Sequence, residues 1–250
     1  MKLVGERRAL AVAVFAFYFL VYTLLLLAGF VAPDAGPMIT GIAGVYGLAF
    51  FALVAGYFWA RWYAIGVGLY GVITGVIGLW QASKDPNLED MIPILIFVGG
   101  THLAATLMLW GNTMAAPYDG QTAWREKLHM DDNAVQRLGR SVIRAGVSLP
   151  LILIYALAPK PETASIVMSI MGLVLAGLGV RALVKLKTWG VLAMGASGAL
   201  MLTLAGAELF WGTHTVRMLY PALGGALMLA ATAPFFSSMA RWVAAPGRVN

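Results

Sequence analysis

His102 stands near the midpoint of a long uncharged stretch of the sequence, where a titratable side chain is unusual. Small residues surround it, namely Gly99, Gly100, Thr101 and Thr106. Ionisable groups inside a membrane are costly and are functional candidates by default. The imidazole could contact a solute or a proton, ligate the metal of a tetrapyrrole, or make a hydrogen bond that serves only packing. We favour packing and predict no cofactor, with a tetrapyrrole at His102 kept as the alternative.

A second candidate for chemistry is the segment Gly195-Ala196-Ser197-Gly198, which resembles the GxSG nucleophile motif of rhomboid intramembrane proteases. The resemblance implies that Ser197 would attack a peptide bond, with a histidine of a later helix as its general base. Only one histidine follows, His214, and it lies 17 residues on in a predicted outer loop. We therefore predict no catalytic residue in this chain.

Glu208 and His214 form a candidate outer polar cluster near Trp211, at the end of an apolar stretch. Such a pair could bind a cation or a polar solute, but a metal site normally needs three or four ligands. We predict a solvated helix end there and no metal site. Apart from His102, the apolar stretches carry essentially no ionisable residue at mid-depth, which disfavours ion-coupled pumps and proton relays.

The elements that position these residues are membrane spans. Hydrophobic residues make up 60% of the chain and charged residues 11%, whereas charged residues are about a quarter of a soluble domain. An uncharged helix of about 20 residues crosses the hydrocarbon core, so we predict an all-α integral membrane protein. The eight predicted spans cover residues 9–31, 38–60, 62–81, 91–110, 145–159, 163–184, 188–207 and 218–239. The fifth is the weakest, since Pro150 interrupts only 15 uncharged residues.

The basic residues predict how the chain is oriented. Of the 17 Lys and Arg residues, all but Lys84, Lys160 and Arg217 fall on one side of an eight-span arrangement. Basic residues are retained on the cytoplasmic side, so both termini are predicted to be cytoplasmic, in a bacterial inner membrane. The net charge of +6 therefore reflects topology and anionic headgroups on the basic side, and we predict no nucleic-acid partner.

An internal repeat relates the two halves of the chain. Trp62, Gly68 and Gly71 recur 127 residues later as Trp189, Gly195 and Gly198. The same offset carries spans two to four onto spans six to eight, which predicts a parallel 4+4 duplication with a pseudo-twofold axis. We expect spans three and seven at the centre of the halves. The predicted helix-packing glycines, which include a GxxxG pair, are Gly68, Gly71, Gly75, Gly195 and Gly198.

This 4+4 architecture is similar to that of haem A synthases, which place histidine pairs in both halves. The present chain differs, because the offset relates His102 to Leu229.

We divide the chain into a first four-helix repeat at 1–118, a cytoplasmic linker at 119–143 and a second four-helix repeat at 144–250. Within the linker, Asp131 to Asn133 are expected to cap an amphipathic helix. Its apolar positions recur at helical spacing and its arginines lie on the other faces, which favours contact with anionic headgroups at the membrane surface.

These observations favour a non-catalytic polytopic membrane protein, most simply a scaffold or accessory subunit of a membrane complex or a homo-oligomer. The alternative is a facilitator or channel for a small neutral or lipidic solute, with a pathway between the two repeats. Its predicted solute contacts are His102, Thr101, Tyr46, Tyr70 and Ser197. A third hypothesis, an intramembrane or lipid-modifying enzyme, lacks paired acid and base groups.

Overall fold

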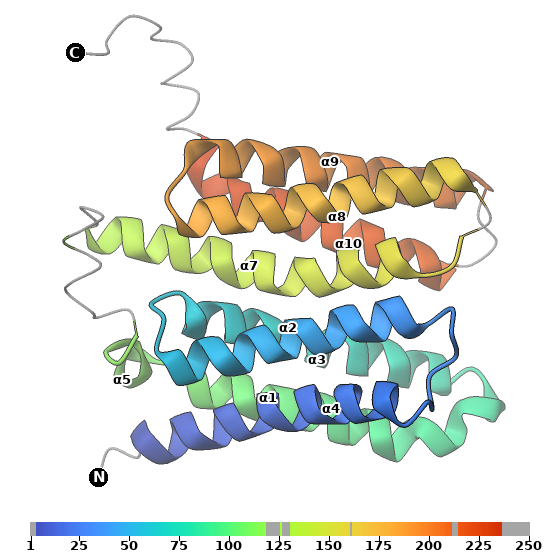
Figure 1. Cartoon of the computed structure of the whole chain (residues 1–250), viewed down its shortest axis with the longest axis horizontal. Helices are drawn as coiled ribbons and strands as arrows, with labels where there is room; N and C mark the ends of the chain where they lie inside the picture. Colours follow the sequence, from blue (N-terminus) through green and yellow to red (C-terminus); the bar gives the residue numbers. More distant parts are fainter. Residues whose placement is uncertain (1–3, 119–125, 127–130, 161, 212–214, 237–250) are drawn as a thin grey trace, which may run out of the picture.

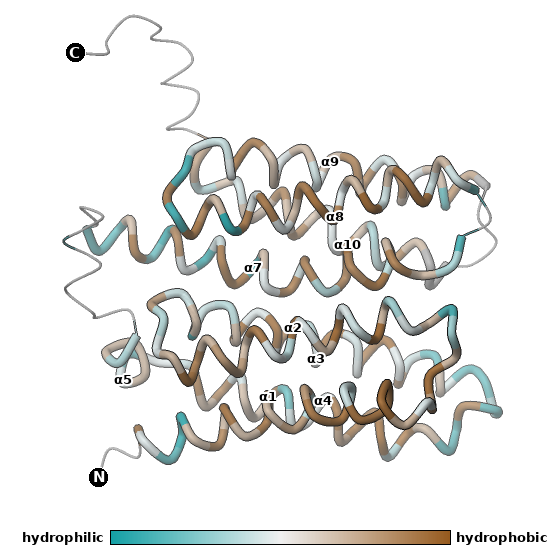
Figure 2. Tube along the Cα trace, viewed as in Figure 1, coloured by the Kyte–Doolittle hydropathy of each residue, from teal (hydrophilic) through white to brown (hydrophobic). Residues whose placement is uncertain are grey.

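The computed structural model of this chain describes residues 4–118, 126, 131–160, 162–211 and 215–236 (Figure 1). Within these ranges the chain is helical and contains no strand. Eight helices are long and apolar enough to cross a membrane, which confirms the prediction of an all-α protein with eight spans. Figure 2 shows hydrophobic residues along the helices and hydrophilic residues at many of the connections.

The helices follow the predicted spans closely. They are α1 (Val4–Leu27), α2 (Gly36–Ala55), α3 (Ala60–Ala82), α4 (Ile92–Leu109), α7 (Asp132–Leu157), α8 (Thr163–Val184), α9 (Thr188–Trp211) and α10 (Thr215–Thr232). Three short elements complete the described chain, namely η1 (Pro86–Met91), α5 (Asn112–Ala115) and η2 (Ala233–Phe235).

The fifth span differs from the prediction, because α7 is one continuous helix rather than a surface helix followed by a short span. Its beginning is as expected, since the Asp131 carboxylate accepts a hydrogen bond of 2.6 Å from the Ala134 N–H. The helix passes through Arg144 without a break, because the Arg144 guanidinium donates to the Ala230 carbonyl of α10 at 2.6 Å. Pro150 is buried inside the same helix.

The helices form two groups of four, α1–α4 and α7–α10, that lie side by side (Figure 1). In the first group, α1 and α3 each contact α2 and α4. In the second group, α7 and α9 each contact α8 and α10. Each group is therefore a four-membered ring in which α2 and α4, or α8 and α10, are diagonal to each other. The seam between the groups is formed by α7 packed against α2 and α3.

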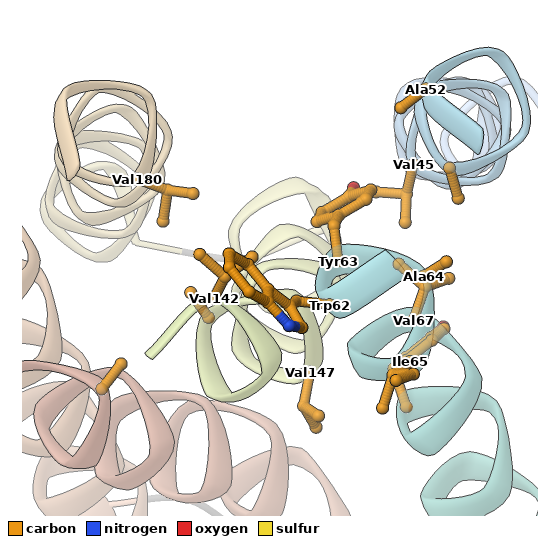
Figure 3. Packing of buried hydrophobic residues seen from close by; sticks show 14 of the residues in the cluster. Val45, Ala52, Trp62, Tyr63, Ala64, Ile65, Val67, Val142, Val147 and Val180 are labelled. Carbon is orange, nitrogen blue, oxygen red and sulfur yellow. The ribbon is translucent and has the colours of Figure 1, made fainter. Parts of the chain in front are cut away.

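The seam is closed by glycines. A Cβ atom on Gly66 of α3 would lie 2.5 Å from the Ile143 carbonyl oxygen and 2.8 Å from the Cα of Gly146 in α7. A Cβ on Gly139 would lie 2.8 Å from the Trp62 ring. Figure 3 shows Trp62 beside Val142 of α7, with Tyr63 directed toward Val45 of α2. The backbones of α3 and α7 thus touch, as small residues allow in membrane helix pairs.

Spans three and seven, which are α3 and α9, were expected at the centre of the two halves. Only α3 lies there, at the seam between the groups. The seventh span, α9, packs on α8 and α10 and lies at the outer edge of the second group (Figure 1). A twofold axis would make each inter-group helix contact reciprocal. The offset of 127 residues relates α1 to the fifth span in α7, α2 to α8 and α3 to α9. Contacts of α7 with α2 and α3 should therefore recur as contacts of α1 with α8 and α9. Among the described residues, the main contacts of α7 with α2 and α3 have no such counterpart.

The ends of the helices that carry most basic residues lie together. The starts of α1 and α7 and the α2–α3 and α8–α9 connections are at the same end of the molecule (Figure 1). There Arg8 donates to the Leu53 carbonyl at 2.9 Å, and Arg7 donates to the Trp110 carbonyl at 2.7 Å. These carbonyls belong to the C-terminal ends of α2 and α4, where a cation is favoured by the helix dipole. The basic residues of α1 therefore also tie it to its neighbours.

Candidate functional site

His102 is fully buried in α4, and both nitrogens of its ring have hydrogen-bond partners. Its Nδ1 lies 2.7 Å from the Val98 carbonyl oxygen, one turn earlier on the same helix. Its Nε2 lies 2.6 Å from the hydroxyl oxygen of Tyr46 on α2. A carbonyl can only accept, so Nδ1–H donates to Val98, and Nε2 accepts from the Tyr46 O–H. For the neutral imidazole, this geometry selects the tautomer that carries its proton on Nδ1.

Aromatic residues of α1 complete the surroundings of His102. The Tyr18 ring centroid lies 4.3 Å from that of the imidazole, and the Tyr18 hydroxyl is 2.7 Å from the Thr101 hydroxyl. Tyr22 stacks on Tyr46 with ring centroids 5.5 Å apart. Three helices, α1, α2 and α4, therefore meet in one hydrogen-bonded aromatic cluster. We call Tyr18, Tyr22, Tyr46, Thr101 and His102 the histidine cluster.

The fourth helix of the group, α3, contributes glycines where the cluster needs space. A Cβ on Gly71 would lie 2.0 Å from Cδ2 of His102, and one on Gly68 would lie 2.2 Å from Oγ1 of Thr106. Gly75 faces Gly99 of α4, with a separation of 3.0 Å from its would-be Cβ to the Gly99 Cα. Helix α4, with His102, therefore packs directly against the glycines of α3.

The corresponding place in the second group is apolar. A Cβ on Gly198 of α9 would lie 2.8 Å from Cγ of Leu229 in α10. The offset of 127 residues relates this pair to Gly71 and His102, so a leucine occupies the place of the histidine. Gly195 differs from its expected packing role, because nothing lies within 4 Å of the position that its Cβ would take.

The other predicted contacts are divided between the two groups. Tyr70 of α3 is buried in the first group. Ser197 is buried within the second group, where its hydroxyl donates to the Gly172 carbonyl of α8 at 2.7 Å. The structure therefore brings Tyr46, Thr101 and His102 together, and it places Ser197 away from them.

The predicted outer polar cluster is described only in part. The Glu208 carboxylate accepts a hydrogen bond of 3.0 Å from the Tyr155 hydroxyl of α7, so it joins two helices of the second group. His214 lies outside the described residues. No group of three or more His, Cys, Asp or Glu side chains that could hold a metal ion occurs in the part of the chain that the structure describes.

Sequence reasoning missed the contribution of α1 to the histidine cluster. Phe15, Tyr18 and Tyr22 recur at intervals of three and four residues, which places their side chains on one face of a helix. Phe15 and Tyr18 are buried, whereas Leu10, Leu20 and Leu24 of the same helix are exposed. The aromatic face of a leucine-rich span was therefore the available signal.

The geometry limits what His102 can do. To ligate a tetrapyrrole metal through Nε2, the imidazole would have to lose its bond to Tyr46, and a planar ring would have to enter a place bounded by Tyr18 and the backbone of Gly71. As arranged, His102 and Tyr46 are hydrogen-bonded to each other and join the diagonal helices α2 and α4.

Comparisons with protein families, curated proteins and solved structures find no match to this chain.

Proposed function

We propose that this protein is a non-catalytic polytopic membrane protein that serves as a scaffold or accessory subunit of a membrane complex. The observation that carries the proposal is a face of small residues on α9 that none of the other helices described by the structure covers. This face consists of Gly195, Ala196, Ala199, Thr203 and Gly206, and we call it the α9 face.

Helix α9 lies on the outer edge of the second helix group (Figure 1). Ala196, Ala199 and Thr203 are exposed, and nothing lies within 4 Å of a Cβ built on Gly195 or Gly206. The Thr203 hydroxyl bonds to the Ala199 carbonyl of its own helix, so it presents its methyl group outward. Lipid tails are as apolar as leucine, so membrane helices associate where small residues let their backbones approach. The partner that fits is another transmembrane helix.

The interior of the protein supports the same proposal. The most polar buried group of the spans, His102, has both nitrogens bonded within the chain, and Ser197 is bonded to a neighbouring helix. The seam between the groups is closed where Gly66 meets Gly146. Tyr46 and His102, two of the predicted solute contacts, face into the first group and do not line the seam. We therefore do not propose the facilitator.

The experiment places a photo-crosslinking amino acid at Ala199 and, in a separate variant, at Gly44 of α2. Gly44 is a matched control because it is also exposed, with nothing within 4 Å of its would-be Cβ. We expect a defined membrane-protein adduct from Ala199 alone. The adduct should disappear in the Gly195→Leu/Gly206→Leu variant and persist in Gly44→Leu.

Equal labelling from both positions, or adducts that ignore the leucine substitutions, would count against the α9 face. The proposal fails altogether when the protein purified in mild detergent is homogeneous and alone, and equilibrates small neutral solutes across liposomes.

We further propose a parallel 4+4 duplication with both termini in the cytoplasm of a bacterial cell. The matched pairs Gly71–His102 and Gly198–Leu229 support the duplication, since both are close contacts and the same offset relates them. The clustering of basic connections at one end supports the orientation.

A further inference from the structure

The basic end of the seam contains a cavity of about 590 Å³ that neither the histidine cluster nor the α9 face uses. It lies between α3, α5 and the first turns of α7, so both helix groups contribute to its walls. The charged side chains that line it are Arg61, Arg140 and Asp132. We propose that this cavity binds the phosphate group of an anionic phospholipid. We call it the seam cavity.

The polar wall of the seam cavity suits a phosphate. Among the described residues of the wall, two guanidinium groups exceed the one carboxylate, so this part of the wall carries a net positive charge. Gln136, in the second turn of α7, adds a side-chain amide that can donate to a phosphate oxygen. Arginine is the side chain best matched to phosphate oxygens, because its planar donors can bind two of them at once.

The remaining wall suits the lipid part of the molecule. Trp62, Ile65 and Ile143 line the cavity below the arginines, at the ends of helices that cross the membrane. Trp110 lies at the rim and is 54% exposed, as expected for a tryptophan at the level of lipid headgroups. Trp62 and Ile65 are almost fully buried in the wall, so the apolar surface left for a ligand belongs to Trp110 and the partly buried Ile143. A soluble phosphate would leave that surface uncovered, whereas glycerol and the first acyl carbons would cover it. The volume is within the usual range of small-molecule sites.

A lipid in this place would bridge the two helix groups. Arg61 belongs to α3 and already donates to the Leu109 carbonyl at 3.3 Å, whereas Arg140 belongs to α7 and donates weakly to Gln136 at 3.4 Å. A phosphate between them would join the first group to the second, beyond the glycine contacts of the seam. Binding would therefore stabilise the folded protein as well as occupy the cavity.

The experiment titrates dioctanoyl phosphatidylglycerol into the purified full-length protein in neutral detergent and follows intrinsic tryptophan fluorescence. Dioctanoyl phosphatidylcholine is the neutral comparison, and glycerol 3-phosphate is the soluble source of the same group. We expect binding of phosphatidylglycerol only. The Arg61→Gln/Arg140→Gln variant should weaken it by on the order of tenfold or more, the usual effect of losing charge-assisted hydrogen bonds.

A matched control separates this site from general surface charge. Arg181→Gln/Lys185→Gln removes the same charge at the same end of the molecule, from residues outside the cavity wall. Equal weakening by the two double variants overturns the proposal, as does an unchanged affinity in both. If glycerol 3-phosphate binds as tightly as the lipid, the ligand is a soluble phosphate and the lipid proposal is wrong.

Should the double variant not fold, Arg140→Gln alone provides the test. Arg140 is exposed, and the side-chain hydrogen bond to Gln136 is long, so this change leaves the helix packing intact. An affinity for phosphatidylglycerol equal to that of the unaltered protein would then refute the site.

Discussion

The hydrogen bond between Tyr46 and His102 gives the sharpest test of the histidine cluster. His102→Leu makes the first helix group resemble the second, where Leu229 packs on Gly198. The new side chain fits the slot but leaves the buried Tyr46 hydroxyl without its acceptor. An unsatisfied buried polar group costs about 1–3 kcal/mol, so we expect the free energy of unfolding to fall by about that amount.

The second half of the test removes the other partner. Tyr46→Phe leaves Nε2 of His102 without a donor, and we expect a loss of about 1–2 kcal/mol in the free energy of unfolding. The double variant leaves neither group unsatisfied, so its loss should be smaller than the sum of the two single losses. Bonds of this kind between membrane helices are worth about 0.6 kcal/mol on average and up to about 1.7 kcal/mol, which sets the expected coupling.

Reversible unfolding by SDS in mixed micelles, followed by circular dichroism, measures all four proteins. Thr203→Val is the control, because this exposed hydroxyl bonds only within its own helix and its loss should change stability by less than about 0.5 kcal/mol. Additive losses in the double variant would refute the coupling. A His102→Leu protein of unchanged stability that loses a bound chromophore would refute the packing role of the histidine.

Two further predictions use features that the structure makes specific. Gly71→Ala should lower the free energy of unfolding by about 1–3 kcal/mol in the same assay, because its Cβ meets the histidine ring, whereas Gly195→Ala in open space should be neutral or stabilising by up to about 1 kcal/mol. A stable Gly71→Ala protein would show that α4 moves freely from α3. The chain contains no cysteine, so an impermeant maleimide should label Ser83→Cys in intact cells and Lys185→Cys only after lysis. The reverse pattern would invert the proposed orientation.

Hydropathy and charge were sufficient to predict the eight spans, because apolar helices of this length have few alternatives in a lipid solvent. The fifth span was misjudged, because its first half reads as a basic surface helix. Arg144 interrupts the hydropathy there, yet its guanidinium donates a hydrogen bond to the Ala230 carbonyl. Val142 and Leu138 of the same helix are buried. A single sequence does not reveal which distant carbonyl will accept such a bond. The continuous helix α7 could therefore be found only from the packing.

The sequence identified residues of the candidate site but not the hydrogen bonds between them. The facilitator hypothesis assigned His102, Thr101 and Tyr46 to solute contact, whereas the favoured prediction for His102 was a packing hydrogen bond, and the structure shows His102 and Tyr46 bonded to each other. Their pairing depends on which helices lie diagonally in the ring, a relation that hydropathy does not encode. The glycines were easier, since Gly71 and Gly75 already predicted a close helix contact.

The difference between the two helix groups explains why a histidine can serve packing in a membrane protein. The 127-residue offset relates Tyr46 to Leu173 and His102 to Leu229, so the second group has leucines where the first has a hydrogen bond. Filling the slot beside the glycine therefore does not require a polar residue. The bond from His102 does something that a leucine cannot, because it fixes α4 to the diagonal helix α2 in one rotation. The first group also forms the seam through α2 and α3, so the position of α2 affects how the second group docks. Specificity of that docking is the physical reason to keep a buried polar pair, and it predicts that the apolar double variant loosens the seam more than the interior of either group.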